Sequence, residues 1–190
     1  MSKKLTPMII EVTPVNKRIM RQRIHHSLGA ISLVYVYAPT EASDLTVKDA
    51  LFAVLDSVVD QCPRQDTLLV LGDCNALTGT DRDGYEMCVG PHGSGTVNQK
   101  STKFHAFARS QGLRVAGSWF QWPQAHRWTW YSNDGDVAKE IDHLLIDGQW
   151  RMMENCRVYR SAQFLNTDHR LVVASLKLQL LIWENGTIPT

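Results

Sequence analysis

The stretch TLLVLGDCN, residues 67–75, determines how the rest of the chain is interpreted. Its first five residues are apolar on both faces of a strand, which predicts a position inside a sheet that is covered on both sides. Asp73 and Asn75 then lie at the carboxyl-terminal rim of that strand. Because functional sites gather at the rims of central strands, the acid and the amide are candidate site residues.

A second polar motif, Thr167-Asp168-His169-Arg170, lies far along the chain at the start of another apolar run. A carboxylate can accept a proton from water, and an imidazole can stabilise charge on an oxyanion. An acid and amide on one strand, with a distant Asp-His pair, therefore suit metal-assisted cleavage of a phosphodiester.

The surrounding pattern predicts alternating strands and helices. Residues 18–24 and 30–37 form a predicted hairpin around a turn at residues 26–29, and residues 47–59 repeat apolar side chains at helical spacing. Residues 79–95 read as a loop, Ser101 as the cap of a helix that ends at Gly112, and Met8 to Val12 as strand-like. Further strands are expected at 113–117, 127–131, 140–146 and 171–180. This order favours a layered α/β sandwich.

Length and composition are those of one globular domain. The chain has 190 residues, 44% of them apolar, and a net charge of +1 that gives no overall electrostatic case for nucleic-acid binding. The four cysteines have no close pairing, and the sequence carries no secretory stretch and no run of about 18 apolar residues. We expect reduced thiols, a nuclear or cytoplasmic location and no membrane span.

Five motifs lie in order along the chain: Tyr37-Ala38-Pro39-Thr40, Gly72-Asp73-Cys74-Asn75, Trp128-Thr129-Trp130, Glu140-Ile141-Asp142-His143 and Asp168-His169. Together they resemble the motifs of the endonuclease/exonuclease/phosphatase superfamily. Within it, the chain resembles the apurinic-type endonucleases of LINE retrotransposons and the craniofacial development protein 2-like group. The resemblance covers residues 13–180, which leaves residues 1–12 as a non-matching segment and 181–190 as a tail.

The resemblance implies a four-layer, DNase-I-like α/β sandwich, a Mg²⁺ cofactor and hydrolysis of DNA phosphodiesters. Asp73 would orient or deprotonate water, and Asn75 would donate to a phosphate oxygen. His169 would stabilise charge on the scissile phosphate, with its tautomer held by Asp142. Tyr37 would place its phenol against the phosphate, and Asp168 would bind or orient the metal.

The chain also departs from the family pattern. Its beginning leaves no room for both early strands that supply an Asn and a metal-binding Glu, so a truncated domain is expected. Glu11 is the only acid before Glu41 and is the candidate replacement ligand. Without it Mg²⁺ would be bound weakly and activity impaired. Uncovered sheet edges would call for a partner chain, and the acidic hairpin at residues 132–136 would repel DNA.

Other interpretations of the same residues stay open. Asp73 and Asn75 are also common turn formers, Tyr37 can simply end a strand, and Trp128 and Trp130 are expected to pack the sheet. For the whole chain, the alternative to an endonuclease is a catalytically inactive, domesticated remnant that acts as a binding or interaction module. A phosphatase or phospholipid-directed hydrolase shares the same elements.

Overall fold

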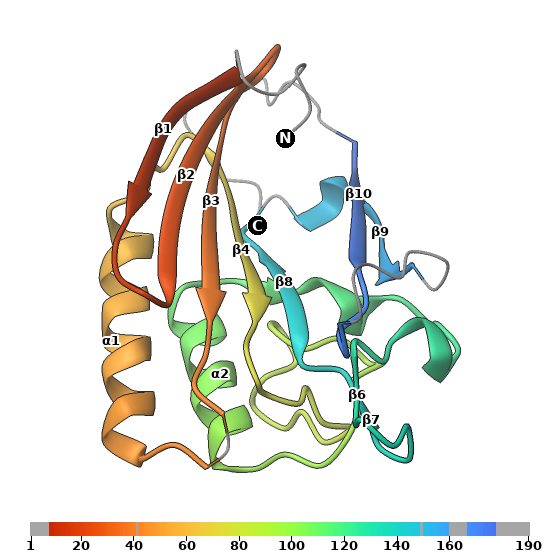
Figure 1. The fold of residues 1–190 in the computed structure, drawn as a ribbon. Coiled ribbons are helices and arrows are strands. Elements are labelled where there is room, and N and C mark those ends of the chain that lie inside the picture. The colour runs from red at the N-terminus through yellow and green to blue at the C-terminus, as the bar shows by residue number, and fades with distance from the viewer. Residues whose placement is uncertain (1–7, 41, 149, 160–166, 178–190) are drawn as a thin grey trace.

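A six-stranded mixed sheet forms the centre of the molecule (Figure 1). The computed structural model describes residues 8–40, 42–148, 150–159 and 167–177. In spatial order the strands of the sheet are β1 (Ile9–Pro14), β2 (Ile19–His26), β3 (Gly29–Tyr37), β4 (Thr67–Asp73), β8 (Asp142–Ile146) and β5 (Arg114–Val115). β1, β2 and β3 form an antiparallel meander, β3 runs parallel to β4, and β8 is antiparallel to both β4 and β5. The predicted hairpin is therefore confirmed.

Two helices cover one face of this sheet. α1 (Leu45–Asp60) contains the predicted helix, and α2 (Gln99–Ser110) ends just before Gly112, as expected. Their apolar side chains pack on buried residues of β3, β4 and β8 to form the main core. Each fully buried aliphatic side chain of this kind stabilises the fold by about 1.5–3 kcal/mol. The core includes Val34, Val36, Leu51, Leu55, Val58, Val70, Phe104, Phe107 and Leu145.

The opposite face carries a smaller core and a second sheet. Ile31, Leu69 and Ile146 are buried there, and Met153 and Leu176 pack against them. These last two residues belong to β9 (Met153–Val158) and β10 (Val172–Leu176), an antiparallel pair. The helices and the second sheet thus lie on different sides of the central sheet (Figure 1), which confirms the α/β sandwich.

Several local predictions were wrong. Asn98, not Ser101, caps α2: its side chain accepts from the backbone N–H groups of Lys100 and Ser101, and the Ser101 hydroxyl instead accepts from the Leu77 N–H. The expected strand at 113–117 is shortened to two residues because a 3₁₀ turn, η2 (Ala116–Trp119), follows at once.

The expected strand at 127–131 is likewise reduced to β6 (Trp130–Tyr131), since the preceding turn η3 (Gln124–His126) holds the Trp128 N–H on the Gln124 carbonyl. β6 pairs with β7 (Ala138–Lys139), which was not predicted, nor were β9 and the turn η4 (Trp150–Met152) before it. Residues 178–180 of the last expected strand lie outside the described residues.

The expected domain boundary at residue 13 falls inside β1, which pairs with β2 from Ile9 onward. Among the residues that the structure describes, no helix has the length and apolarity needed to cross a bilayer.

Candidate active site

The end of β4 is folded back on itself by Asp73 and Asn75. The Asn75 backbone N–H donates to Asp73 Oδ1 at 2.8 Å, and the Asn75 side-chain amide donates to Asp73 Oδ2 at 2.9 Å. Asn75 has a φ of 48°, a left-handed conformation that Asn adopts more readily than most residues. The pair is therefore a turn, as its residue types suggest, and at the same time a fixed carboxylate with both oxygens oriented.

Gly72 allows β3 and β4 to approach each other closely beside this turn. A Cβ atom on Gly72, at φ +141°, would lie 2.0 Å from the Val36 carbonyl oxygen. Beyond that contact the Ala38 N–H donates to the Asp73 carbonyl at 2.7 Å, and the Ala38 carbonyl accepts from the Asn75 amide at 3.0 Å. Tyr37 is paired with Asp73 in the β3–β4 register, so their side chains are neighbours.

Asp142 begins β8 and is paired with Asp73 in the antiparallel register. Its Oδ2 lies 2.9 Å from Nδ1 of His169. A carboxylate at Nδ1 holds the imidazole in one orientation and favours a proton on that nitrogen. The structure thus brings together two residues that the sequence placed in separate motifs.

The short strand β6 holds the Asp168-His169 segment in place. The Tyr131 N–H donates to the Asp168 carbonyl at 3.0 Å, and the indole N–H of Trp130 donates to Asp168 Oδ2 at 2.7 Å. Trp130 lies in the β6–β7 sheet, and its polar edge also fixes an acidic side chain at the cleft. The sequence offered no specific signal for this contact, because Trp130 and Asp168 are 38 positions apart.

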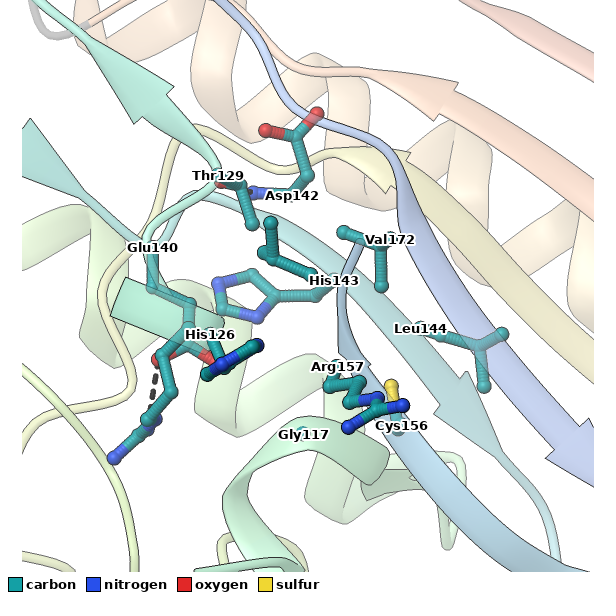
Figure 2. A pocket seen from close by; sticks show the side chains of 12 residues that line it. Gly117, His126, Thr129, Glu140, Asp142, His143, Leu144, Cys156, Arg157 and Val172 are labelled. Carbon is teal, nitrogen blue, oxygen red and sulfur yellow. Dashed lines mark hydrogen bonds and ion pairs between the residues drawn. The ribbon is translucent and has the colours of Figure 1, made fainter. Parts of the chain in front are cut away.

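Thr129 joins this segment to β8. Its buried hydroxyl accepts from the backbone N–H groups of both Ile141 and Asp142 at 3.0 Å, and its carbonyl accepts from the Arg170 N–H at 2.7 Å. In Figure 2, Thr129 and Asp142 lie side by side at a small pocket of about 20 Å³. Thr129 therefore anchors the backbone on both sides of the Asp142–His169 contact.

A buried ion pair supports the other side of the same pocket. Arg127 Nη2 lies 2.7 Å from Glu140 Oε2, which also accepts from the Ser94 hydroxyl at 2.6 Å. Glu140 is 5% exposed, so its charge needs these partners. The pair fixes the residues that lead into β8.

A cleft of about 460 Å³ opens over the ends of β3 and β4. Predicted site residues that line it are Tyr37, Asp73, Asn75, Asp168 and His169, while Asp142 lies behind His169. Residues not singled out from the sequence also line it, and Lys139 is the cation among them. The other lining residues are Thr40, Leu77, Asn98, Trp130 and Ile141.

Tyr37 is 54% exposed, and the Arg18 guanidinium lies 5.4 Å from the centre of its ring. A phenol this open to the cleft is free to meet a ligand. Arg18 lies at the turn before β2, so the basic amino-terminal third of the chain contributes at least one cation beside the cleft.

Glu11 does not join this site. It lies on β1, and β2 and β3 separate that strand from β4. Its carboxylate accepts from Arg21 at 2.9 Å and from the Thr13 hydroxyl. The two predicted metal ligands, Glu11 and Asp168, are therefore not brought together, and the described residues contain no cluster of three or more potential metal ligands.

Burial raises the pKa of the Asp73 carboxyl above its usual range, and the neighbouring Asp142 carboxylate acts in the same direction. The hydrogen bond from the Asn75 backbone and the positive charges of His169 and Lys100 oppose this rise. A carboxylate of raised basicity accepts a proton more readily, which suits a general base.

No family model matches the chain. It is similar to craniofacial development protein 2 of Bos taurus and of Tragulus javanicus, with 26% identity in each case over 188 residues. The matched region is 99% of this chain and 31% and 32% of those relatives, so the chain spans about a third of their length.

Solved structures similar to this chain include a 3′ phosphatase and two endonucleases. The 3′ phosphatase NExo from Neisseria, bound to a product DNA hairpin, matches with a TM-score of 0.64 and 18% identity over 88% of this chain and 71% of that one. The endonuclease domain of the telomere-specific retrotransposon TRAS1 matches with a TM-score of 0.60 and 14% identity, over 85% of this chain and 64% of that one. An AP endonuclease from Archaeoglobus fulgidus matches with a TM-score of 0.62 and 12% identity, over 90% of this chain and 72% of that one. The chain shares the α/β fold of these structures.

The superfamily resemblance inferred from five motifs is thus confirmed at the level of the fold. Cys74, within one of those motifs, is buried in the main core, as expected, and points away from the cleft. Lys139 and Asn98 were missed because they lie outside the five motifs, on β7 and at the cap of α2, whereas Trp130 lies within a motif but was expected only to pack the sheet.

Proposed function

We propose that this chain hydrolyses phosphodiester bonds of DNA with the help of a divalent cation, as an endonuclease of retrotransposon origin. The observation that carries the proposal is the convergence of the Asp73–Asn75 turn and the Asp142–His169 pair on one open cleft. The DNA-bound state of NExo and the retrotransposon origin of TRAS1, as their descriptions give them, support the choice of DNA.

In this proposal Asp73 holds the attacking water and takes its proton. Its two oxygens are already fixed by Asn75, so the base is oriented before substrate binds. With Nδ1 of His169 facing Asp142, Nε2 is the nitrogen left for a phosphate oxygen. Tyr37 places its phenol against the same phosphate, and Lys139 contributes positive charge to the cleft.

A Mg²⁺ ion fits this donor set only modestly. Mg²⁺ binds one or two carboxylates together with water and substrate phosphate, and Asp168 is the carboxylate that would hold it here. The ion would neutralise charge on the phosphate oxygens. Because Glu11 is paired with Arg21 away from the cleft, we propose weak metal binding and reduced activity.

The test is nicking of supercoiled plasmid by the purified protein across a range of Mg²⁺ concentrations, with EDTA as a control. Asp73→Asn and His169→Gln should abolish nicking, whereas Asp134→Asn, on the exposed 132–136 hairpin, should not reduce it. Circular dichroism and thermal unfolding would verify that each variant is folded. Nicking that survives both site substitutions would refute the assignment.

The second candidate is a module that binds without cleaving. The position of Glu11 away from the cleft and the acidic residues Asp134 and Asp136 of the exposed 132–136 hairpin favour this interpretation. Folded protein that produces no nicks at any Mg²⁺ concentration, yet retards DNA in a gel, would establish it. Release of phosphate from inositol phosphates without nicking would instead identify a phosphatase.

A further inference from the structure

Lys100 has an unusual position for a cation. It is 1% exposed, and it lies in the first turn of α2, two residues after the Asn98 cap. Burial removes the ammonium group from water, and the positive end of the helix dipole disfavours a cation at this place. A lysine that meets both penalties must be stabilised by groups inside the protein.

One such group is the carbonyl oxygen of Pro39, which accepts a hydrogen bond from Lys100 Nζ. Pro39 belongs to the segment that leaves β3 and runs past the end of β4. The preceding residue, Ala38, is bonded through its N–H to Asp73 and through its carbonyl to Asn75, and the following residue, Thr40, lines the cleft. Lys100 thus contacts, from α2, the segment to which the Asp73–Asn75 turn is hydrogen-bonded.

The second group is the Asp73 carboxylate. The charges that act on Asp73 come from three directions: Asp142 on β8, His169 ahead of β10, and Lys100 on α2. Lys139 and Asp168 also line the cleft. Of these groups Lys100 is the cation in a fully buried position, where electrostatic interactions are least screened.

We propose that Lys100 is a positioning residue of the site: its buried ammonium group holds residues 38–40 and the Asp73 carboxylate in place beneath the cleft. Its importance for cleavage rests on the proposed function. Its effect on Asp73 does not, because the ionisation of Asp73 can be followed without any substrate.

The experiment is a pH titration of carboxyl carbons by NMR in protein labelled with ¹³C-aspartate, with the Asp73 signal assigned by its loss in Asp73→Asn. In Lys100→Met the midpoint of Asp73 should move to higher pH. Lys100→Gln, which keeps a donor for Pro39 but not the charge, should show the same shift. Lys103→Met removes a cation from the same helix, one paired with exposed Asp49, and should leave the midpoint unchanged.

The coupling must also appear in the reverse direction, since linkage is reciprocal. In Asp73→Asn, with Lys100 intact, the ¹⁵Nζ titration of Lys100 should move to lower pH. This measurement decides the question if both Lys100 variants fail to fold. Unchanged midpoints for Asp73 in folded Lys100 variants, or for Lys100 in Asp73→Asn, would overturn the proposal.

If the protein cleaves DNA, Lys100→Met should also move the acidic limb of the pH–rate profile to higher pH, while Lys103→Met should not. A protein that cleaves nothing would refute the proposed function and leave the NMR result to decide the role of Lys100. A lower cleavage rate in Lys100→Met, with the acidic limb of the pH–rate profile at the same pH as in the wild type, would mean that Lys100 has only a structural role.

Discussion

His169 Nδ1 and Asp142 Oδ2 lie 2.9 Å apart, although 27 positions separate the two residues in the sequence. Asp142 is fixed at the start of β8, and His169 by its bridge to Trp130, so neither side chain has to move for the contact to form. The hydrogen bond sets which ring nitrogen faces the cleft.

Asp142→Asn should therefore lower the rate of cleavage by about 100- to 10,000-fold, because a neutral amide no longer selects the tautomer or stabilises a protonated ring. The measurement is single-turnover cleavage of a labelled duplex. Asp60→Asn, at an exposed acid on α1, serves as the matched control. A rate for Asp142→Asn within a few-fold of the wild type would contradict the role assigned to the pair.

Gly72→Ala should destabilise the fold strongly, by about 2–4 kcal/mol, because its Cβ would meet the Val36 carbonyl as well as adopt an unfavourable φ. Gly29→Ala is the matched control: its φ of +145° is nearly the same, but nothing lies within 4 Å of the added Cβ. Urea unfolding of both variants separates the clash from the backbone strain. Equal losses of stability would show that the close approach of β3 and β4 is unimportant.

Thr129→Val should cost about 1–3 kcal/mol, since it leaves the N–H groups of Ile141 and Asp142 without their acceptor in a buried place. Thr129→Ser keeps the hydroxyl and should lose much less. Thermal unfolding gives the stabilities, and cleavage assays should show a larger loss for Val than for Ser. The reverse order would exclude the hydroxyl as the anchor of Asp142.

Acidification should weaken the fold partly through Asp66. Burial alone would raise the pKa of this carboxyl, but hydrogen bonds from Arg23 and Ser32 outweigh it and hold the pKa below its usual range. A carboxyl whose pKa is lower in the folded than in the unfolded state stabilises the fold at pH values above the unfolded-state pKa. That stabilisation is lost as the pH falls through the folded-state pKa.

Asp66→Asn should consequently be less stable than wild type at pH 7 and lose less stability between pH 5 and pH 2. Urea unfolding at several pH values provides the comparison, with Asp60→Asn as a control at an exposed acid on α1. Parallel curves for wild type and Asp66→Asn would show that the Arg23 pair contributes nothing to acid sensitivity.

The parts of the fold that the sequence predicted well are those with strong periodicity. The β2–β3 hairpin, α1 and β4 have long apolar patterns, and these were placed within two residues at most of their ends. Strands of two residues, such as β5, β6 and β7, have no periodicity to detect. Their place is set by tertiary contacts, as when Thr129 and Lys139 bond across β6 and β7.

The site shows the same division. Asp73, Asn75 and His169 lie in motifs and meet in the cleft, as the resemblance implied. Glu11 was considered because it was the first acid in the chain, but position in sequence says nothing about which edge of the sheet a strand occupies. Lys100 was missed because a lysine in a polar helical stretch usually faces solvent.

Tyr37, Asp73 and Asp142 occupy one row across β3, β4 and β8, each opposite the next in register. A slip of one residue in any of these strands would turn its side chain to the other face of the sheet. The apolar residues that lock the register, Val34, Val70 and Leu145, thus also keep these three polar groups in line. Core substitutions that loosen strand alignment should abolish cleavage at temperatures where the chain is still folded, so the loss of activity on heating would precede the loss of secondary structure.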